Sequence, residues 1–220
     1  MNAIVKRSLL ATVILCCYSI AVAQLPVELF AGHKRASIDI MFFRFFKNRH
    51  AQQTPWLFFN RNRATVDYTI TPTTNLPQFG FTEAISFNHK KLKGIAPVAV
   101  AAVLNRGIYP KAGIQFTRSG KNTTLFTWLV CDVLQHPNID WFFLGRYTPG
   151  ISKKLHLFAQ AELVNAFPTY DKNNYNFIQR IRLGLKIKEY QLGLGADFTA
   201  TGRGHFNTTQ NMGVFLRHEF

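Results

Sequence analysis

Serine and histidine side chains are the first candidates for chemistry in this sequence. Nucleophilic catalysis needs a serine within reach of a histidine that a carboxylate or amide orients. After residue 23 the serines are Ser37, Ser86, Ser119 and Ser152, and none has a histidine two positions away or lies in a Gly-x-Ser-x-Gly elbow. Ser152 and His156 are four residues apart, beside a Pro-Gly turn. The spacing therefore favours a protein without catalysis, and a lipid-modifying acyl hydrolase stays as the alternative.

Metal and thiol chemistry have little support. The 7 histidines show neither His-x-His nor His-Glu-x-x-His spacing, so we expect no metal site, and no motif indicates a cofactor. Cys131 is the single cysteine after residue 23 and follows Leu129 and Val130. We expect it to pack as a small apolar side chain rather than to act as a nucleophile.

Charged side chains recur at alternate positions of several segments, the spacing that places them on one face of a strand. Nine basic and six acidic side chains share this parity. The main candidates for a charged lumen are Arg61, Arg63, Asp67, Lys111, Arg146, Glu162, Arg180, Arg182, Lys186, Asp197 and Arg217. An open lumen of this kind would weakly prefer anions. Alternatively the charges pair across strands, Arg180 and Arg182 with Asp197 and Arg217 with Glu219, and plug a narrow barrel.

The elements that would position these charges have a period of two. From Tyr190 to Ala200, one parity is Tyr, Leu, Leu, Ala, Phe, Ala and the other is mostly polar or glycine. The segment 177–187 alternates in the same way, and a tight turn at Glu189 joins the two into a hairpin. Apolar side chains on one face and polar ones on the other match a strand between lipid and a lumen.

Turn-forming clusters divide the chain into about eleven such runs, and 25–32 adds a short first strand. Long strands with short connections predict an all-β fold, a transmembrane antiparallel up-and-down β-barrel of about 12 strands, with 10 as the alternative. Closure satisfies every backbone hydrogen bond in lipid. No run after residue 23 is long enough for a spanning helix.

Two segments fit this pattern poorly. Ile95 to Leu104 is apolar on both parities and contains Pro97, and Met41 to Phe46 holds four phenylalanines. They indicate either irregular strands or a lumen partly filled by side chains. Aromatic residues near strand ends predict girdles at the two membrane interfaces: Trp56, Phe58, Phe59, Tyr68, Phe79, Trp128, Trp141, Tyr147, Phe167, Tyr170 and Tyr190.

The N-terminal segment has the features of a secretory signal. Lys6 and Arg7 precede an apolar run, and Ala21-Val22-Ala23 ends it. We expect residues 1–23 to be removed during export by the general secretory route, which leaves a barrel domain of residues 24–220. The 26 basic residues against 11 acidic ones are spread along the chain, with only Lys90, Lys91 and Lys93 clustered. This distribution favours contacts with lipopolysaccharide and phospholipid phosphates over nucleic-acid binding.

The last ten residues end in an aromatic carboxylate. Met212, Val214, Leu216 and Phe220 alternate as an apolar stripe that only His218 interrupts. This segment resembles the C-terminal strand of Gram-negative outer-membrane β-barrel proteins. The resemblance implies an outer-membrane location and recognition by the barrel-assembly machinery. We therefore expect a small passive pore or a structural barrel, then the acyl hydrolase, and third a soluble exported ligand-binding β-protein; the oligomeric state is left open.

Overall fold

The computed structural model describes residues 25–69, 77–105, 107–134, 138–170 and 173–220. The predicted signal segment 1–23 lies outside these residues. The described chain forms twelve strands and one 3₁₀ turn at Lys90–Leu92. The strands are β1 (Pro26–Gly32), β2 (Arg35–Lys47), β3 (Gln53–Asp67), β4 (Gln78–Phe87), β5 (Ile95–Leu104), β6 (Gly107–Ser119), β7 (Thr123–Asp132), β8 (Asn138–Tyr147), β9 (Leu155–Pro168), β10 (Tyr175–Ile187), β11 (Tyr190–Arg203) and β12 (His205–Glu219).

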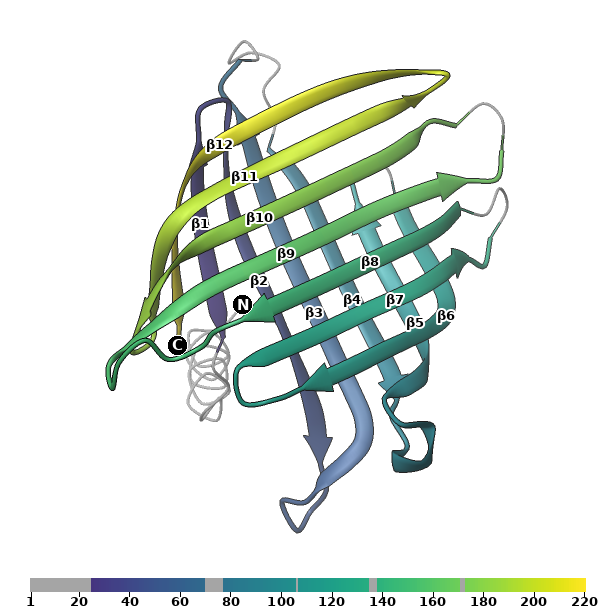
Figure 1. Ribbon diagram of the computed structural model, residues 1–220. Helices are drawn as coiled ribbons and strands as arrows, with labels where there is room; N and C mark the ends of the chain where they lie inside the picture. The colour runs from purple at the N-terminus through teal and green to yellow at the C-terminus, as the bar shows by residue number, and fades with distance from the viewer. Residues whose placement is uncertain (1–24, 70–76, 106, 135–137, 171–172) are drawn as a thin grey trace, which may run out of the picture.

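Each strand pairs with its neighbours in sequence, and β1 pairs with β12, so the sheet is a closed barrel (Figure 1). All twelve pairings are antiparallel. The predicted up-and-down barrel of 12 strands is confirmed, including the short first strand. None of the described helices is long and apolar enough to cross a membrane.

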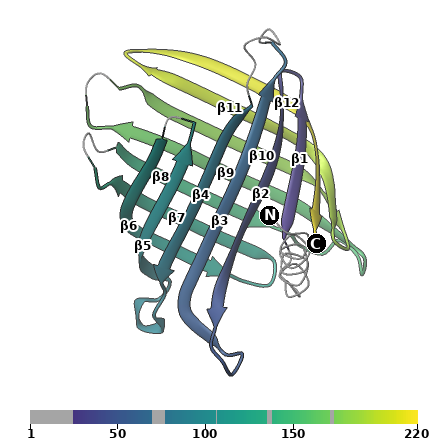
Figure 2. The ribbon, with the colours of Figure 1, turned by 180° about the vertical axis from the view of Figure 1, so that it is seen from behind.

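The two ends of the barrel differ in what they hold. At one end Leu25 and Phe220 exchange backbone hydrogen bonds of 3.1 and 3.2 Å, and the Glu189 carbonyl accepts from the Glu219 N–H at 3.0 Å. We call this end the terminal rim; β1 and β12 lie side by side above it in Figure 2. At the opposite end, the distal rim, strands β1, β3, β5, β7, β9 and β11 end.

The outer face carries large exposed apolar side chains. Leu194 is 68 % exposed, Leu192 is 61 % exposed, and Leu183 and Ile181 expose about half of their surface on the next strand. Alternate side chains of a strand point to opposite faces. Exposed apolar side chains also occur on other strands, among them Leu29 of β1, Ile114 of β6 and Leu129 of β7, so the belt extends around the barrel. A closed barrel with such an apolar belt is a membrane protein of the outer-membrane type.

Polar side chains interrupt the outer belt on β3 and β4. By parity Asn60, Asn62 and Glu83 point outward, and the Asn60 amide donates to the Glu83 carboxylate at 3.3 Å. Asn62 donates in turn to Asn60 at 3.2 Å. The outward parity is therefore not apolar throughout, and Gln179 of β10, at the parity of Ile181 and Leu183, is a further polar residue on this face.

Strand β5, which is apolar on both parities, and the phenylalanine-rich segment of β2 each direct alternate side chains into the interior, among them Met41, Phe43 and Phe45 of β2. On β5 the buried parity is Ala96, Val98, Val100 and Ala102, and β5 pairs with β6 without a register shift. Pro97 lies beyond the last pair of β4 and β5, Ser86 with Val98, so its missing N–H interrupts no bond to β4. The single register shift recorded between β2 and β3 lies at Phe45 and Lys47.

Candidate functional site

The middle of the barrel holds Arg61, whose side chain crosses the interior from β3 to β9. Its Nε and Nη2 donate to the Asp39 carboxylate on β2, and its Nη1 donates to Glu162 Oε1 at 2.7 Å. β3 and β9 are not neighbours in the sheet. The contact with Glu162 therefore spans the lumen, and both side chains are almost completely buried.

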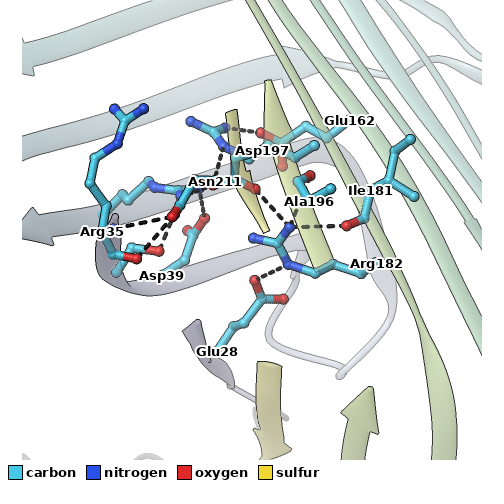
Figure 3. Close-up of polar contacts among 12 residues, drawn as sticks. Glu28, Arg35, Asp39, Glu162, Ile181, Arg182, Ala196, Asp197 and Asn211 are labelled. Atoms are coloured by element: carbon cyan, nitrogen blue, oxygen red, sulfur yellow. Dashed lines mark hydrogen bonds and ion pairs between the residues drawn. The ribbon is translucent and has the colours of Figure 1, made fainter. Parts of the chain in front are cut away.

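Arg182 forms the second cross-strand contact of this region. Its Nε donates to Glu28 Oε1 at 2.9 Å and its Nη1 to Asp197 Oδ1 at 2.7 Å (Figure 3). The guanidinium also lies 4.0 Å from the centre of the Phe30 ring. This cation–π contact adds to the two ion pairs because the group is only 2 % exposed.

Arg63 and Arg180 link the two parts. Arg63 contacts Asp39 at 3.2 Å and Asp197 at 3.0 Å, and Arg180 binds Glu162 and lies 3.8 Å from Asp197. The resulting central network contains four arginines and four carboxylates: Arg61, Arg63, Arg180, Arg182, Glu28, Asp39, Glu162 and Asp197. Its formal charges balance, which is the condition under which buried ions are tolerated.

Arg146 and Arg217 form a separate pair nearer the terminal rim. Arg146 donates to Gln160 Oε1 through Nε at 3.0 Å and Nη2 at 2.9 Å, and Arg217 Nη1 donates to the same oxygen at 3.2 Å. Both guanidiniums lie 5.8 Å from the Phe158 ring centre. Neither forms an ion pair with a described carboxylate. Arg217 Nε and Nη2 are buried without a hydrogen-bond partner among the described atoms.

The other predicted charged residues lie apart from the central network. Lys186 pairs with Glu219 at 2.5 Å, near the terminal rim. Lys111 bridges Asp132 and Asp140. Asp67 lies at the distal end of β3, where Arg35 approaches it at 3.8 Å. The suggested pairing of Arg217 with Glu219 does not form, because Lys186 and Gln191 bind that carboxylate instead.

Glu28 and Asp39 belong to the central network but were not among the predicted residues. The alternation of polar and apolar residues could have identified them, because Glu28 lies between Val27 and Leu29, and Asp39 lies between Ile38 and Ile40. Both therefore have the polar parity of a strand. Adding them raises the acidic side of the parity count from six to eight, against nine basic side chains. Arg35 of β2 and Arg203 of β11 have the same inward parity and were not counted either, so a small basic excess remains in the interior.

The other side of the interior is apolar. Phe126 is fully buried and its ring lies 5.1 Å from Phe59, 5.5 Å from Trp128 and 5.9 Å from Phe142 between ring centres. The aromatic cluster comprises Met41, Leu57, Phe59, Ala84, Val98, Val100, Phe126, Trp128, Val130, Phe142 and Leu144. Phe59 and Trp128 therefore lie inside, and their prediction as girdle residues is wrong; Trp56, Tyr68, Tyr147 and Tyr190 are outwardly exposed.

Cavities flank the central network. A cavity of about 310 Å³ lies toward the distal rim between Arg35, Thr65, Asn176 and Asn211. A second cavity, of about 390 Å³, lies over the aromatic cluster. Arg63 and Arg180 line both, and they also line a space of about 10 Å³ within the network. The interior is thus hollow toward the distal rim and narrows sharply at the arginines.

In the described part of the chain, no serine hydroxyl forms a hydrogen bond with a histidine. Ser37 Oγ accepts from Arg63, and Ser86 Oγ accepts from the Asn88 amide. Ser152 lies in the turn before β9, where its backbone N–H binds the Leu155 carbonyl.

The four apolar residues of the C-terminal stripe lie on the outer face. Met212, Val214, Leu216 and Phe220 are each between 45 and 69 % exposed. The interrupting residue, His218, packs between two aromatic rings, 4.4 Å from Tyr190 and 4.2 Å from Phe220 between ring centres. The histidine thus extends an aromatic patch at the terminal rim.

Neither a protein-family model nor a curated protein sequence matches this chain. Among solved structures, the NanC porin superposes with a TM-score of 0.52 at 11 % identity, over 89 % of this chain and 99 % of that one. The chain has the fold of an outer-membrane porin-type β-barrel. The KdgM porin gives a TM-score of 0.44 at 10 % identity, over 89 % and 98 % of the two chains. At such identities the likeness shows the fold alone.

Proposed function

We propose that this porin-type barrel is a narrow passive channel for small solutes, with a weak preference for anions. The observation that carries the proposal is the pair Arg146 and Arg217, which share one neutral amide oxygen on Gln160. Fixed guanidiniums along a lumen lower the barrier for negative solutes and raise it for positive ones. The preference is weak because the remaining interior charges nearly balance.

Planar-bilayer recording tests this proposal. Under a KCl gradient, the reversal potential of the wild-type channel should indicate a modest excess of chloride permeability. The double variant Arg146→Gln with Arg217→Gln should abolish that excess, because it removes the two guanidiniums without carboxylate partners. The matched control, Lys47→Gln with Arg49→Gln, removes two exposed charges beside the turn after β2 and should leave the reversal potential unchanged.

A closed structural barrel is the second candidate, and a specific observation favours it. Arg61 and Glu162 meet across the lumen, while the aromatic cluster fills the opposite side. If this packing never opens, purified protein in bilayers will give no resolvable conductance step. That result would reject the channel and leave the structural role.

We also propose that the terminal rim faces the periplasm. The turn at Glu189 would then be protected in intact cells, whereas the connections within 168–176 and 201–208 would be cut by added protease. Cleavage at Glu189 in intact cells would reverse the orientation. N-terminal sequencing of the mature protein tests the proposed export signal, for which we expect Gln24 as the first residue.

We also propose two partners for this barrel, the barrel-assembly machinery and membrane lipids. Removal of Phe220 should lower the yield of assembled barrel if the assembly machinery reads the C-terminal stripe. Exposed Lys and Arg residues at the rims suit the phosphate groups of lipopolysaccharide and phospholipid. Lys90 and Lys91 follow β4 and so lie at the terminal rim, which we propose to face the periplasmic leaflet. Lower retention on vesicles containing anionic phospholipid after Lys90→Gln and Lys91→Gln would support the phospholipid contact.

A further inference from the structure

The cavity over the aromatic cluster has a composition unlike that of a passage for hydrophilic solutes. Its floor is formed by the rings of Phe59, Trp128 and Phe142, and one wall by Val100 and Ala102 of β5. Its volume of about 390 Å³ lies within the range of small-molecule sites, which combine apolar walls with a few polar groups.

Strand β5 explains why this wall is apolar. Its outward parity faces lipid, and its inward parity would carry polar residues if the lumen only conducted water and ions. Instead Val98, Val100 and Ala102 are buried against the aromatic cluster or the cavity. An apolar wall of this kind gains free energy when an apolar solute replaces water at it.

The charged side of the same cavity is cationic. Four cations line it, Arg61, Arg63, Lys111 and Arg180, against the single carboxylate of Asp140. The carboxylates that pair with these arginines line other spaces: Asp39 and Glu162 the narrow space within the network, and Asp197 the cavity toward the distal rim. Arg180 Nε is buried and lacks a hydrogen-bond partner among the described atoms.

We infer that this cavity binds small hydrophobic carboxylates, compounds with an aromatic or aliphatic body and one carboxylate group. The body would lie on the Phe59, Trp128 and Phe142 rings, and the carboxylate would face the arginines. A charge-assisted hydrogen bond to a guanidinium is stronger than one between neutral groups. Binding does not require that the barrel conduct, so the inference stands or falls separately from the proposed channel.

Equilibrium dialysis of the full barrel in lipid nanodiscs tests the inference, with empty nanodiscs subtracted for partitioning into lipid. The probe is 2-naphthoate, compared with 2-naphthol, which has the same rings without the charge, and with gluconate, a hydrophilic carboxylate. We expect saturable binding of 2-naphthoate and about tenfold weaker binding of both comparison compounds.

Two phenylalanine substitutions on neighbouring residues of β5 provide the control. Ala102→Phe fills the cavity and should weaken 2-naphthoate binding about tenfold or more. Ala101→Phe adds the same ring to the lipid face of the same strand and should leave binding unchanged. The shift in gel mobility on heating verifies that both variants form closed barrels.

Each other outcome overturns the inference in a defined way. Equal binding of gluconate would show a general anion site, and equal binding of 2-naphthol would show an apolar site without charge selection. Undiminished binding in a folded Ala102→Phe barrel would place the probe elsewhere. Absence of saturable binding would reject the site while leaving the conductance experiment unaffected.

Discussion

The interior of this barrel has two regions of opposite chemistry built by the same alternation of side chains. The central network joins β1–β3 to β9–β11 through ion pairs, whereas the aromatic cluster joins β2–β5 to β7 and β8 through ring contacts. The boundary runs along β3, where buried Phe59 is followed two residues later by buried Arg61. An inward position on a strand therefore determines that a side chain is buried, but it does not determine whether that side chain is polar or apolar.

The two regions should respond differently to the loss of one group. Removing a carboxylate from a balanced buried network leaves a buried cation without a partner. The free-energy cost of that unpaired charge exceeds the net stabilisation that the original ion pair provided. Removing a methyl or ring from the cluster costs the transfer free energy and leaves a cavity. The following substitutions test that contrast.

The largest effect is expected for Glu162→Gln. Glu162 binds both Arg61 and Arg180 and is 2 % exposed, so the neutral amide leaves two guanidiniums undercompensated. We expect the free energy of unfolding to fall by about 4 kcal/mol, measured by urea unfolding in lipid vesicles. The control Glu189→Gln, in the exposed turn between β10 and β11, should change it little. Equal stability of the two variants would mean that water already screens the network.

A somewhat smaller effect is expected in the aromatic cluster. Leu144→Ala removes a fully buried side chain of β8 and should lower the free energy of unfolding by about 3 kcal/mol. Leu129→Ala, on the lipid face of β7, is the matched control, because lipid can occupy the space that the smaller side chain leaves. A larger loss for Leu129→Ala than for Leu144→Ala would contradict the assignment of inner and outer faces.

Much of the fold was accessible from sequence because alternation is a local property. Tyr190 to Ala200 and the segment before it contain the hairpin, its turn and its inward glycines without any distant information. The apolar stripe of the last ten residues likewise follows from its parity. A strand that must face lipid on one side has little freedom in composition, and this constraint makes the pattern readable.

The distribution of chemistry within the lumen was not accessible in the same way. Phe59 and Trp128 belong to a core because β3 lies across the interior from β7, a relation that depends on closure of the whole sheet. The contact between Arg61 and Glu162 also joins strands far apart in sequence. The alternation in the sequence predicts whether a side chain points into the lumen or toward lipid. Which side chain it contacts across the lumen depends on how the whole barrel closes.

The smallest effect is expected at the outer face, for Glu83→Leu. Glu83 points outward on β4 and binds only the Asn60 amide among the described residues, on a face whose side chains are mostly apolar. Carboxylates on a lipid-facing surface are destabilising, although less so than cations. We expect the leucine variant to be more stable by about 1 kcal/mol in urea unfolding, with Ile85→Leu on the same face as the neutral control. Destabilisation by Glu83→Leu would instead mean that a polar surface, and not lipid tails, covers Glu83, Asn60 and Asn62 in the membrane. The contrast between a mixed interior and an apolar exterior would then not hold on this side of the barrel.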